Sequence, residues 1–343
     1  MSCFNDIITR LSDEGNLRRI PTGDQADGVV DLSSNDYLGL ALRPGLQTEF
    51  FSRTGATSIP MTSSASRLLA SHQEEYHMLE ELLSGLYHRP ALIFNSGYHA
   101  NTGMVSAIAQ SAKTLIVADR LVHASIIDGM TLSKSPFTRF RHNDLTHLRR
   151  ILEKEASCYE QVLVIVESVY SMDGDRADID GLAEIKRDHP NVLLYVDEAH
   201  AFGVEGVHGL GICRSSKCYD DIDIIVGTFG KACASMGAFC AVSAPLKDYL
   251  VNRSRSLIFS TALPPMTAAW TIFMIEKFLD MDAEREHLKV LGERLQSILS
   301  PMSPGFPITA SHIQPLVAGD PKRAVALSAK LLDYGFKVLP IRV

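Results

Sequence analysis

Short runs of apolar, often β-branched residues alternate along the chain with longer segments whose apolar residues recur every three to four positions. The short runs predict strands at 92–94, 115–117, 162–166, 192–196 and 222–226. The periodic segments predict helices at 74–87, 101–110, 145–154 and 182–187. The strand runs are continuously apolar, which is typical of strands covered on both faces. The alternation therefore predicts an α/β fold with a mainly parallel sheet, whose ligands gather at the carboxyl ends of the strands.

The pattern changes after residue 246, where two long helical tracts at about 263–281 and 283–299 precede a proline-rich stretch. Beyond that stretch we expect a strand, a helix and a strand, at 313–317, 322–333 and 336–339. The predicted organisation is an N-terminal arm, a large domain, and linking helices with a small α/β domain, at 1–45, 46–245 and 246–343. The chain stops in the middle of the last pattern, so we expect the small domain to be incomplete.

Composition narrows the class of protein. The 343 residues are 46% hydrophobic and 21% charged, which excludes a mainly disordered, collagenous or coiled-coil chain. The longest apolar runs are far too short to span a bilayer, and no signal peptide is recognisable, so we expect a cytoplasmic protein without a membrane partner. The net charge of −7 argues against nucleic-acid binding. The six cysteines form no zinc-binding spacing, and we expect no metal.

Two groups of chemically capable residues directly follow predicted strands. Asp197 ends one strand and His200 follows it, so a carboxylate and an imidazole could face a cationic heterocycle in the crevice. A helix cap beside a hydrogen-bonded histidine would explain the same residues. Lys231 lies in a glycine-bearing turn after the next strand, where an ordinary surface lysine is the alternative. A nucleotide-binding P-loop is excluded, because Ala232 stands where that motif needs a hydroxyl.

Three further strand ends carry polar side chains. Ser96, Gly97 and Tyr98 open a predicted helix, whose free N–H groups could bind a phosphate. His123 follows the second predicted strand, and Ser171 lies in the polar loop after the third. Each of these residues could also be an ordinary turn or capping residue.

Taken in order, these strand ends resemble those of the pyridoxal-phosphate enzymes of the aspartate aminotransferase fold. They are most similar to the α-oxoamine synthases, which condense an amino acid with an acyl thioester. Further motifs of that family stand at 33–40, 142–144, 259–265 and 313–316. The resemblance implies an aminotransferase-like large domain with pyridoxal 5'-phosphate as cofactor, and the small C-terminal domain described above.

The resemblance also implies roles for the catalytic residues. Lys231 would bond covalently to the cofactor, and Asp197 would pair with its ring nitrogen. His123 would stack on the ring, while His200 and Ser171 would bind its phenolic oxygen.

Other residues would hold the phosphate and the substrate. Ser96, Gly97, Tyr98 and Thr228 would surround the phosphate, and Thr261 would reach the phosphate of a neighbouring subunit, which implies a homodimer. The substrate's carboxylate would call for a guanidinium. The candidates for this guanidinium are Arg18, Arg19 and Arg342, and Asn35 is expected close by.

Family members differ in the amino acid and the acyl group they accept, and these choices depend on pocket shape rather than on the shared motifs. A cofactor-free scaffold subunit of the same fold is the non-enzymatic alternative. The presence of Lys231 argues against it, because a scaffold would not need the amine.

Overall fold

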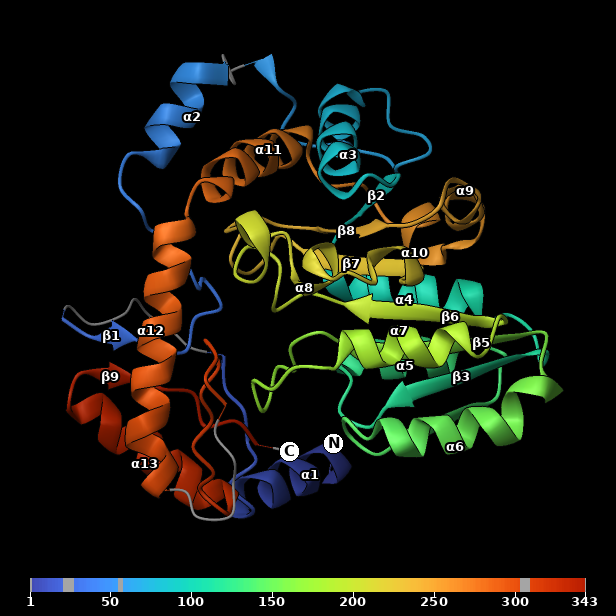
Figure 1. Ribbon diagram of the computed structural model, residues 1–343. Helices are drawn as coiled ribbons and strands as arrows, with labels where there is room; N and C mark the ends of the chain where they lie inside the picture. Colours follow the sequence, from blue (N-terminus) through green and yellow to red (C-terminus); the bar gives the residue numbers. More distant parts are fainter. Residues whose placement is uncertain (1, 21–27, 55–57, 303–308, 343) are drawn as a thin grey trace.

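The computed structural model describes residues 2–20, 28–54, 58–302 and 309–342. Within these residues, a seven-stranded sheet of order β2-β8-β7-β6-β5-β3-β4 forms the centre of the molecule (Figure 1). Its strands are β2 (Ala91–Phe94), β3 (Thr114–Asp119), β4 (Phe137–Phe140), β5 (Gln161–Glu167), β6 (Val192–Asp197), β7 (Ile224–Thr228) and β8 (Ala238–Ala241). The neighbours from β4 to β7 pair in parallel, and β8 is antiparallel to both β7 and β2. The predicted α/β fold with a mainly parallel sheet is confirmed.

Helices cover both faces of the sheet, because alternate residues of its strands point to opposite sides. Val162 and Val164 of β5 join one hydrophobic cluster with α3, α6, α7 and α11, whereas Leu163 and Ile165 join a second cluster with α4, α5, α9 and α10. The helices of the first face are α3 (Glu74–Tyr87), α6 (Leu145–Glu155), α7 (Ile179–Arg187) and α11 (Pro265–Leu279). Those of the second face are α4 (Gly97–Ile108), α5 (Ala124–Leu132), α9 (Ala244–Arg253) and α10 (Arg255–Ile258).

Side-chain caps fix where several of these helices begin. Ser96, Asp144 and Asp178 each accept a hydrogen bond from a backbone N–H in the first turn of α4, α6 and α7. The cap of α4 places its first turn directly after β2. Further helical segments are α8 (Ile212–Ser215), α12 (Asp282–Leu299) and 3-10 turns at Ala156–Cys158, Val207–Gly209, Tyr219–Asp221 and Ser300–Met302.

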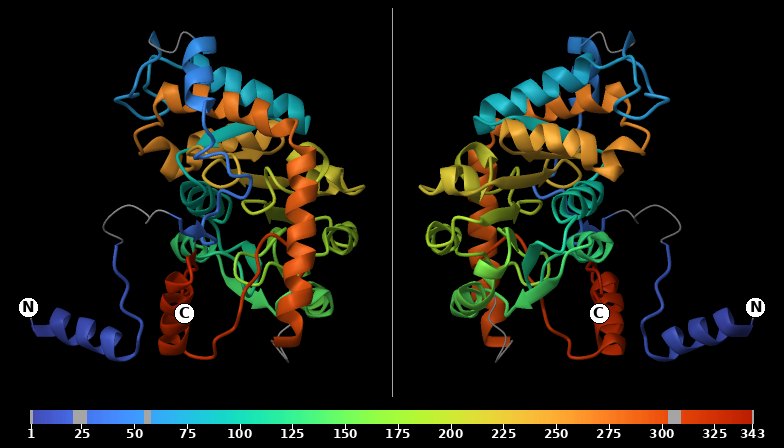
Figure 2. Two further views of the ribbon diagram at one scale, coloured as in Figure 1. Left: turned by 90° about the vertical axis from the view of Figure 1, so that its left-hand side faces the viewer. Right: turned by 90° about the vertical axis from the view of Figure 1, so that its right-hand side faces the viewer.

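The N-terminal and C-terminal segments meet outside the main sheet. β1 (Val30–Asp31) pairs in parallel with β9 (Phe336–Lys337). The other elements of these segments are α1 (Ser2–Asp13), α2 (Leu46–Thr54) and α13 (Pro321–Asp333). Figure 2 shows α1 standing away from the sheet, at the same end of the molecule as α13.

Three predictions of local structure need correction. The strand expected at 313–317 is wrong, since these residues form no strand and Pro315 has no N–H to donate to a ladder. The strand expected at 336–339 is shorter, because it pairs only over β9. β4 and β8 were not predicted: Phe-Thr-Arg-Phe has no continuous apolar run, and Ala-Phe-Cys-Ala has no β-branched residue.

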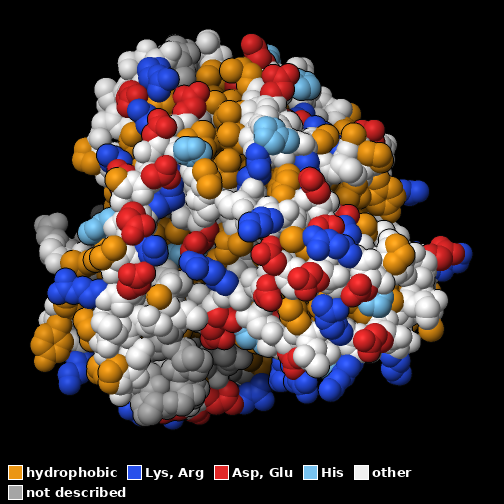
Figure 3. All heavy atoms as spheres, in the orientation of Figure 1, with side chains coloured by type: hydrophobic (Ala, Val, Ile, Leu, Met, Phe, Trp, Pro, Cys, Tyr) orange, Lys and Arg blue, Asp and Glu red, His pale blue; other side chains and the backbone are white. Residues whose placement is uncertain are grey.

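The surface carries charges of both signs. Figure 3 shows acidic and basic side chains interspersed over one face. Among the described residues, no helix combines the length and the hydrophobicity that a bilayer crossing requires.

Candidate active site

The carboxyl ends of β5, β6 and β7 meet at one edge of the sheet, because the three strands run in parallel. The register pairs Glu167 with Asp197, and Asp197 with Val226. The loops that follow β6 and β7 carry His200 and Lys231. Parallel pairing therefore gathers, at one place, side chains that are far apart in the sequence.

Lys231 and His200 are in direct contact. Nζ of Lys231 lies 2.7 Å from Nε2 of His200. Burial lowers the pKa of Lys231, although the nearby carboxyl groups of Asp197 and Glu167 act in the opposite direction where they are ionised. Burial, together with the charge of Lys231, lowers the pKa of His200 to about 2. A neutral imidazole therefore lies against an amine that loses its proton more easily than an exposed lysine.

Asp197 is held in a fixed orientation by its neighbours. Its carboxylate accepts a hydrogen bond from Nδ2 of Asn101 at 2.7 Å and from the N–H of Ala199 at 2.9 Å. Asn101 is held in turn by the hydroxyl of Tyr195, which donates to its Oδ1 at 2.6 Å. Asp197 is only 3% exposed, so its carboxyl group is buried as well as held in orientation.

His123 lies at the start of α5, beside the same cluster. Its Nδ1 lies 2.8 Å from Oγ of Ser125, and its backbone N–H donates to Glu167. Burial lowers the pKa of His123, and the charges of Asp197 and Lys231 also act on it. Burial therefore favours the neutral form of this ring.

Glu167 is a buried acid that the sequence did not single out. It is 2% exposed, and burial together with the charge of Asp197 raises its pKa to about 8. Burial beside Asp197 therefore favours the protonated form of Glu167.

The first turn of α4 forms a cradle for an anion. Ser96 caps the helix, and the N–H groups at the start of a helix have no acceptor within it. A Cβ atom on Gly97 would lie in van der Waals contact with Thr228, at 3.7 Å, so the first turn of α4 lies beside the carboxyl end of β7. Thr228 donates through Oγ1 to the carbonyl of Gly237, and Tyr98 donates to Asp128. Backbone donors and the positive end of a helix favour a phosphate here.

Two predicted cofactor residues are not connected to this cluster. Ser171 lies half-buried in the β5–α7 loop, and among the described residues no hydrogen bond joins it to His200. Thr261 is exposed; it forms a backbone bridge with Ser66 and accepts a hydrogen bond from Asn95 through its carbonyl.

The predicted substrate residues form two separate groups. Arg18 donates to the carbonyl of Arg342, and Arg342 donates to the carbonyls of Gly15 and Leu17, so these arginines lie together. Arg19 is exposed. Asn35 instead reaches the cluster around Lys231 through Tyr37, whose hydroxyl lies 3.1 Å from Oδ1 of Asn35.

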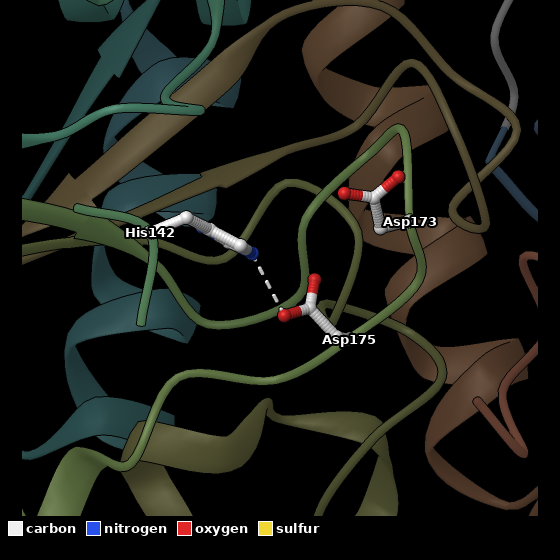
Figure 4. Close-up of side chains that lie close together, drawn as sticks. All are labelled: His142, Asp173 and Asp175. Carbon is white, nitrogen blue, oxygen red and sulfur yellow. Dashed lines mark hydrogen bonds and ion pairs between the residues drawn. The ribbon is translucent and has the colours of Figure 1, made fainter. Parts of the chain in front are cut away.

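His142 clamps two loops near this edge of the sheet. Its Nδ1 lies 2.9 Å from Asp119, and its Nε2 lies 2.8 Å from Asp175. Burial opposes the charged ring, but the hydrogen bonds to both carboxylates raise the pKa of His142 to about 10. Figure 4 shows Asp173 on the same loop as Asp175. These side chains lie within reach of a common metal ion, but a protonated imidazole has no lone pair to offer one.

Sequence reasoning missed the residues that orient the candidates. Tyr37, Asn101, Ser125 and Glu167 each contact a predicted residue through a side chain. Only Glu167 carried a signal, because it ends a buried strand as Asp197 does. The other contacts depend on how the chain folds back on itself.

The comparisons with known proteins agree with this fold. Residues 27–343 match the family described as aminotransferase class I and II, so the chain belongs to that family. A solved structure, a serine palmitoyltransferase from S. paucimobilis with a bound PLP–myriocin aldimine, has a TM-score of 0.85 and 26% identity. The alignment covers 98% of this chain and 90% of that one. The fold class is confirmed, and the chain is an enzyme of the acyltransferase group within this family.

Within the family, the chain is similar to 8-amino-7-oxononanoate synthases. A relative in Pasteurella multocida, provisionally given that name, is 48% identical over 92% of this chain and 81% of its own length. A relative of the same provisional name in Haemophilus influenzae (strain 86-028NP) is 43% identical, and the match covers all of this chain and 92% of the relative. The solved 8-amino-7-oxononanoate synthase of Francisella tularensis has a TM-score of 0.74 at 26% identity, over 92% of this chain and 88% of that one.

Proposed function

We propose that this chain is a pyridoxal-phosphate enzyme that condenses L-alanine with a pimeloyl thioester, the step that gives 8-amino-7-oxononanoate in biotin synthesis. The new bond joins the α-carbon of alanine to the acyl carbonyl, while the thiol and carbon dioxide leave. Ten carbons enter and nine remain in the product. The names and the identity of the relatives support this choice of substrates.

One observation carries the cofactor assignment: the contact between the Lys231 amine and His200, at the edge where Asp197 presents its carboxylate. The residues fit pyridoxal phosphate at three points. Lys231 offers an amine whose pKa is lowered by burial, Asp197 offers a buried carboxylate for a ring nitrogen, and α4 offers an anion cradle beside Gly97. When bound, the cofactor would supply an electron sink for charge on the amino acid's α-carbon.

Each side chain of the candidate site would then have a separate role. Lys231 would hold the cofactor covalently and later take the α-proton onto Nζ. Asp197 would keep the ring nitrogen protonated, with Asn101 holding the carboxylate in place. His123 would lie against the ring face, and His200 would donate to the phenolic oxygen.

The remaining predictions extend this proposal. Arg18 and Arg342, which lie together, would bind a carboxylate, and Asn35 would contact the substrate from the side of Tyr37. Ser171 would complete the contacts to the ring, and Thr261 would serve a second subunit of a homodimer. We also keep the cytoplasm as the expected location.

The first experiment locates the cofactor bond. The full chain is incubated with pyridoxal phosphate, reduced with borohydride, digested and analysed by mass spectrometry. We expect the cofactor on the peptide that contains Lys231, and none in Lys231→Ala. The control is Lys247→Ala, which removes a lysine that pairs with Glu80 and should leave the label on Lys231. A label on another lysine, or an unlabelled chain, would overturn the assignment.

The second experiment separates related substrates. Release of free thiol is measured with alanine and pimeloyl-CoA, with serine and palmitoyl-CoA, and with glycine and acetyl-CoA. We expect the first pair to give the highest kcat/KM. The TM-score of 0.85 to a serine palmitoyltransferase makes the second pair the strongest alternative. A preference for the third pair would favour a 2-amino-3-oxobutyrate CoA ligase. If the chain binds no cofactor and turns over none of the pairs, a scaffold role is favoured.

A further inference from the structure

The side chain of His200 is contacted at both ring nitrogens. Nε2 faces the Lys231 amine at 2.7 Å, and Nδ1 faces the hydroxyl of Tyr37, also at 2.7 Å. A neutral imidazole carries one ring proton, so one nitrogen donates and the other accepts. Whichever group occupies Nδ1 therefore decides what Nε2 offers to Lys231.

Tyr37 is held in place by residues from both ends of the chain. It lies in the N-terminal segment, and its ring meets His312 of the C-terminal segment edge-on, with the ring centres 4.4 Å apart. His312 is almost fully buried: its side chain is 1% exposed. The hydroxyl of Tyr37 therefore reaches Nδ1 of His200 from a position fixed by packing.

The Tyr37 hydroxyl has one proton and two possible acceptors. Nδ1 of His200 lies at 2.7 Å and Oδ1 of Asn35 at 3.1 Å, so the imidazole is the closer partner. Burial raises the pKa of Tyr37 well above its ordinary value, which keeps the hydroxyl protonated. Burial also keeps His200 neutral by lowering its pKa. A hydroxyl donor at Nδ1 places the imidazole proton on Nε2, and this N–H faces the Lys231 amine, whose pKa is lowered by burial.

We propose that Tyr37 is a positioning residue that sets the tautomer of His200, so that Nε2–H points to the reactive amine of Lys231. The consequence for catalysis rests on the proposed function: the same N–H would donate to the cofactor's phenolic oxygen. Asn35 competes for the Tyr37 proton, so a ligand that engages the Asn35 amide would release this proton for His200.

The test reads the tautomer directly. Ring-¹⁵N histidine is incorporated into the full chain, and long-range ¹H–¹⁵N correlation spectra are recorded with and without pyridoxal phosphate. The signal of His200 is assigned by its absence in His200→Gln. We expect the Nε2–H tautomer in the unsubstituted chain in both states. If His200 of the unsubstituted chain is found as the Nδ1–H tautomer, that observation alone overturns the proposal.

Tyr37→Phe keeps the ring that packs on His312 but removes the hydroxyl. We expect His200 to shift to a mixture of tautomers, and kcat of the loaded enzyme to fall about tenfold. The control is Tyr249→Phe, which removes a hydroxyl that donates to the carbonyl of Ala107 on α4 at 2.7 Å. It should change neither quantity.

The result separates this inference from the proposed function. An unchanged His200 spectrum in Tyr37→Phe refutes the tautomer role, even if the enzyme makes the expected product. A changed spectrum in a chain that fails to release thiol supports the role and refutes only the proposed substrates.

Discussion

Replacing His142 by Gln tests how strongly its clamp holds two loops of the site. The change removes a cation that lies between Asp119, which is fully buried, and Asp175. The pKa of His142 rises from 6.5 to about 10 on folding, because its hydrogen bonds to both carboxylates outweigh the cost of burial. Each pKa unit corresponds to about 1.4 kcal/mol, so the full shift sets an upper limit of roughly 5 kcal/mol.

The expected loss is smaller than that limit. The side chain of His142 is 23% exposed, and solvent screens part of the attraction. Asp119 also keeps two backbone donors, the N–H groups of Leu121 and Asn143. We therefore expect His142→Gln to lower the free energy of unfolding by about 2–3 kcal/mol at pH 6.

The pH dependence gives this prediction its sharpest test. A histidine whose pKa is raised by folding stabilises fully below its unfolded pKa of 6.5, and loses this contribution as the pH rises towards 10. Urea unfolding between pH 6 and pH 10 should show the free energies of unfolding of the unsubstituted chain and of His142→Gln becoming more similar as the pH rises. His77→Gln, an exposed change on α3, is the control and should parallel the unsubstituted chain. A difference in free energy of unfolding between His142→Gln and the unsubstituted chain that stays constant with pH would refute the reasoning.

Two further substitutions test buried groups beside the site. Glu167→Gln should gain stability relative to the unsubstituted chain as the pH rises from 4.5 to 8, because the pKa of Glu167 is raised to about 8 by burial and the unfolded carboxyl ionises first. Urea unfolding at pH 5 and pH 8.5 measures the difference in free energy of unfolding between Glu167→Gln and the unsubstituted chain. The same difference at both pH values would contradict the prediction. Gly211→Ala should lower stability by about 3 kcal/mol or more, since its Cβ would lie 2.1 Å from Oε2 of the buried Glu198. Gly45→Ala is the matched control, because Gly45 has a similar φ of +85° with nothing within 4 Å. Equal melting temperatures for the two variants would show that the contact with Glu198 does not matter.

The sequence predicted those parts of the fold where one signal dominates. β5 and β6 are continuously apolar because helices cover both of their faces, so their runs stand out. β8 has the sequence Ala-Phe-Cys-Ala, and its place in the sheet depends on pairing with β2 and β7. Pairing of this kind leaves no periodic trace in a run of four residues.

The same distinction applies to the candidate site. Lys231, Asp197 and His200 directly follow strands, so their common location follows from parallel topology. Tyr37 contacts His200 across 163 positions of sequence, and Arg18 contacts Arg342 across 324. Contacts of that range depend on how the terminal segments pack against the sheet, which no local pattern encodes.

The electrostatics of the cluster favour one kind of ligand. Burial lowers the pKa of His123, His200 and His312, so none of these three rings brings a positive charge to the site at neutral pH. Burial keeps Glu167 protonated by raising its pKa. Asp197 therefore lies buried near three uncharged rings and the Lys231 amine, whose pKa is lowered by burial, and a buried carboxylate is costly unless it is paired. A ligand that carries a protonated ring nitrogen would supply the missing charge, and its own ring proton would be held by Asp197 in return. Under the proposed function, the cluster would favour a heterocycle that is cationic at the ring and anionic at the end that reaches α4.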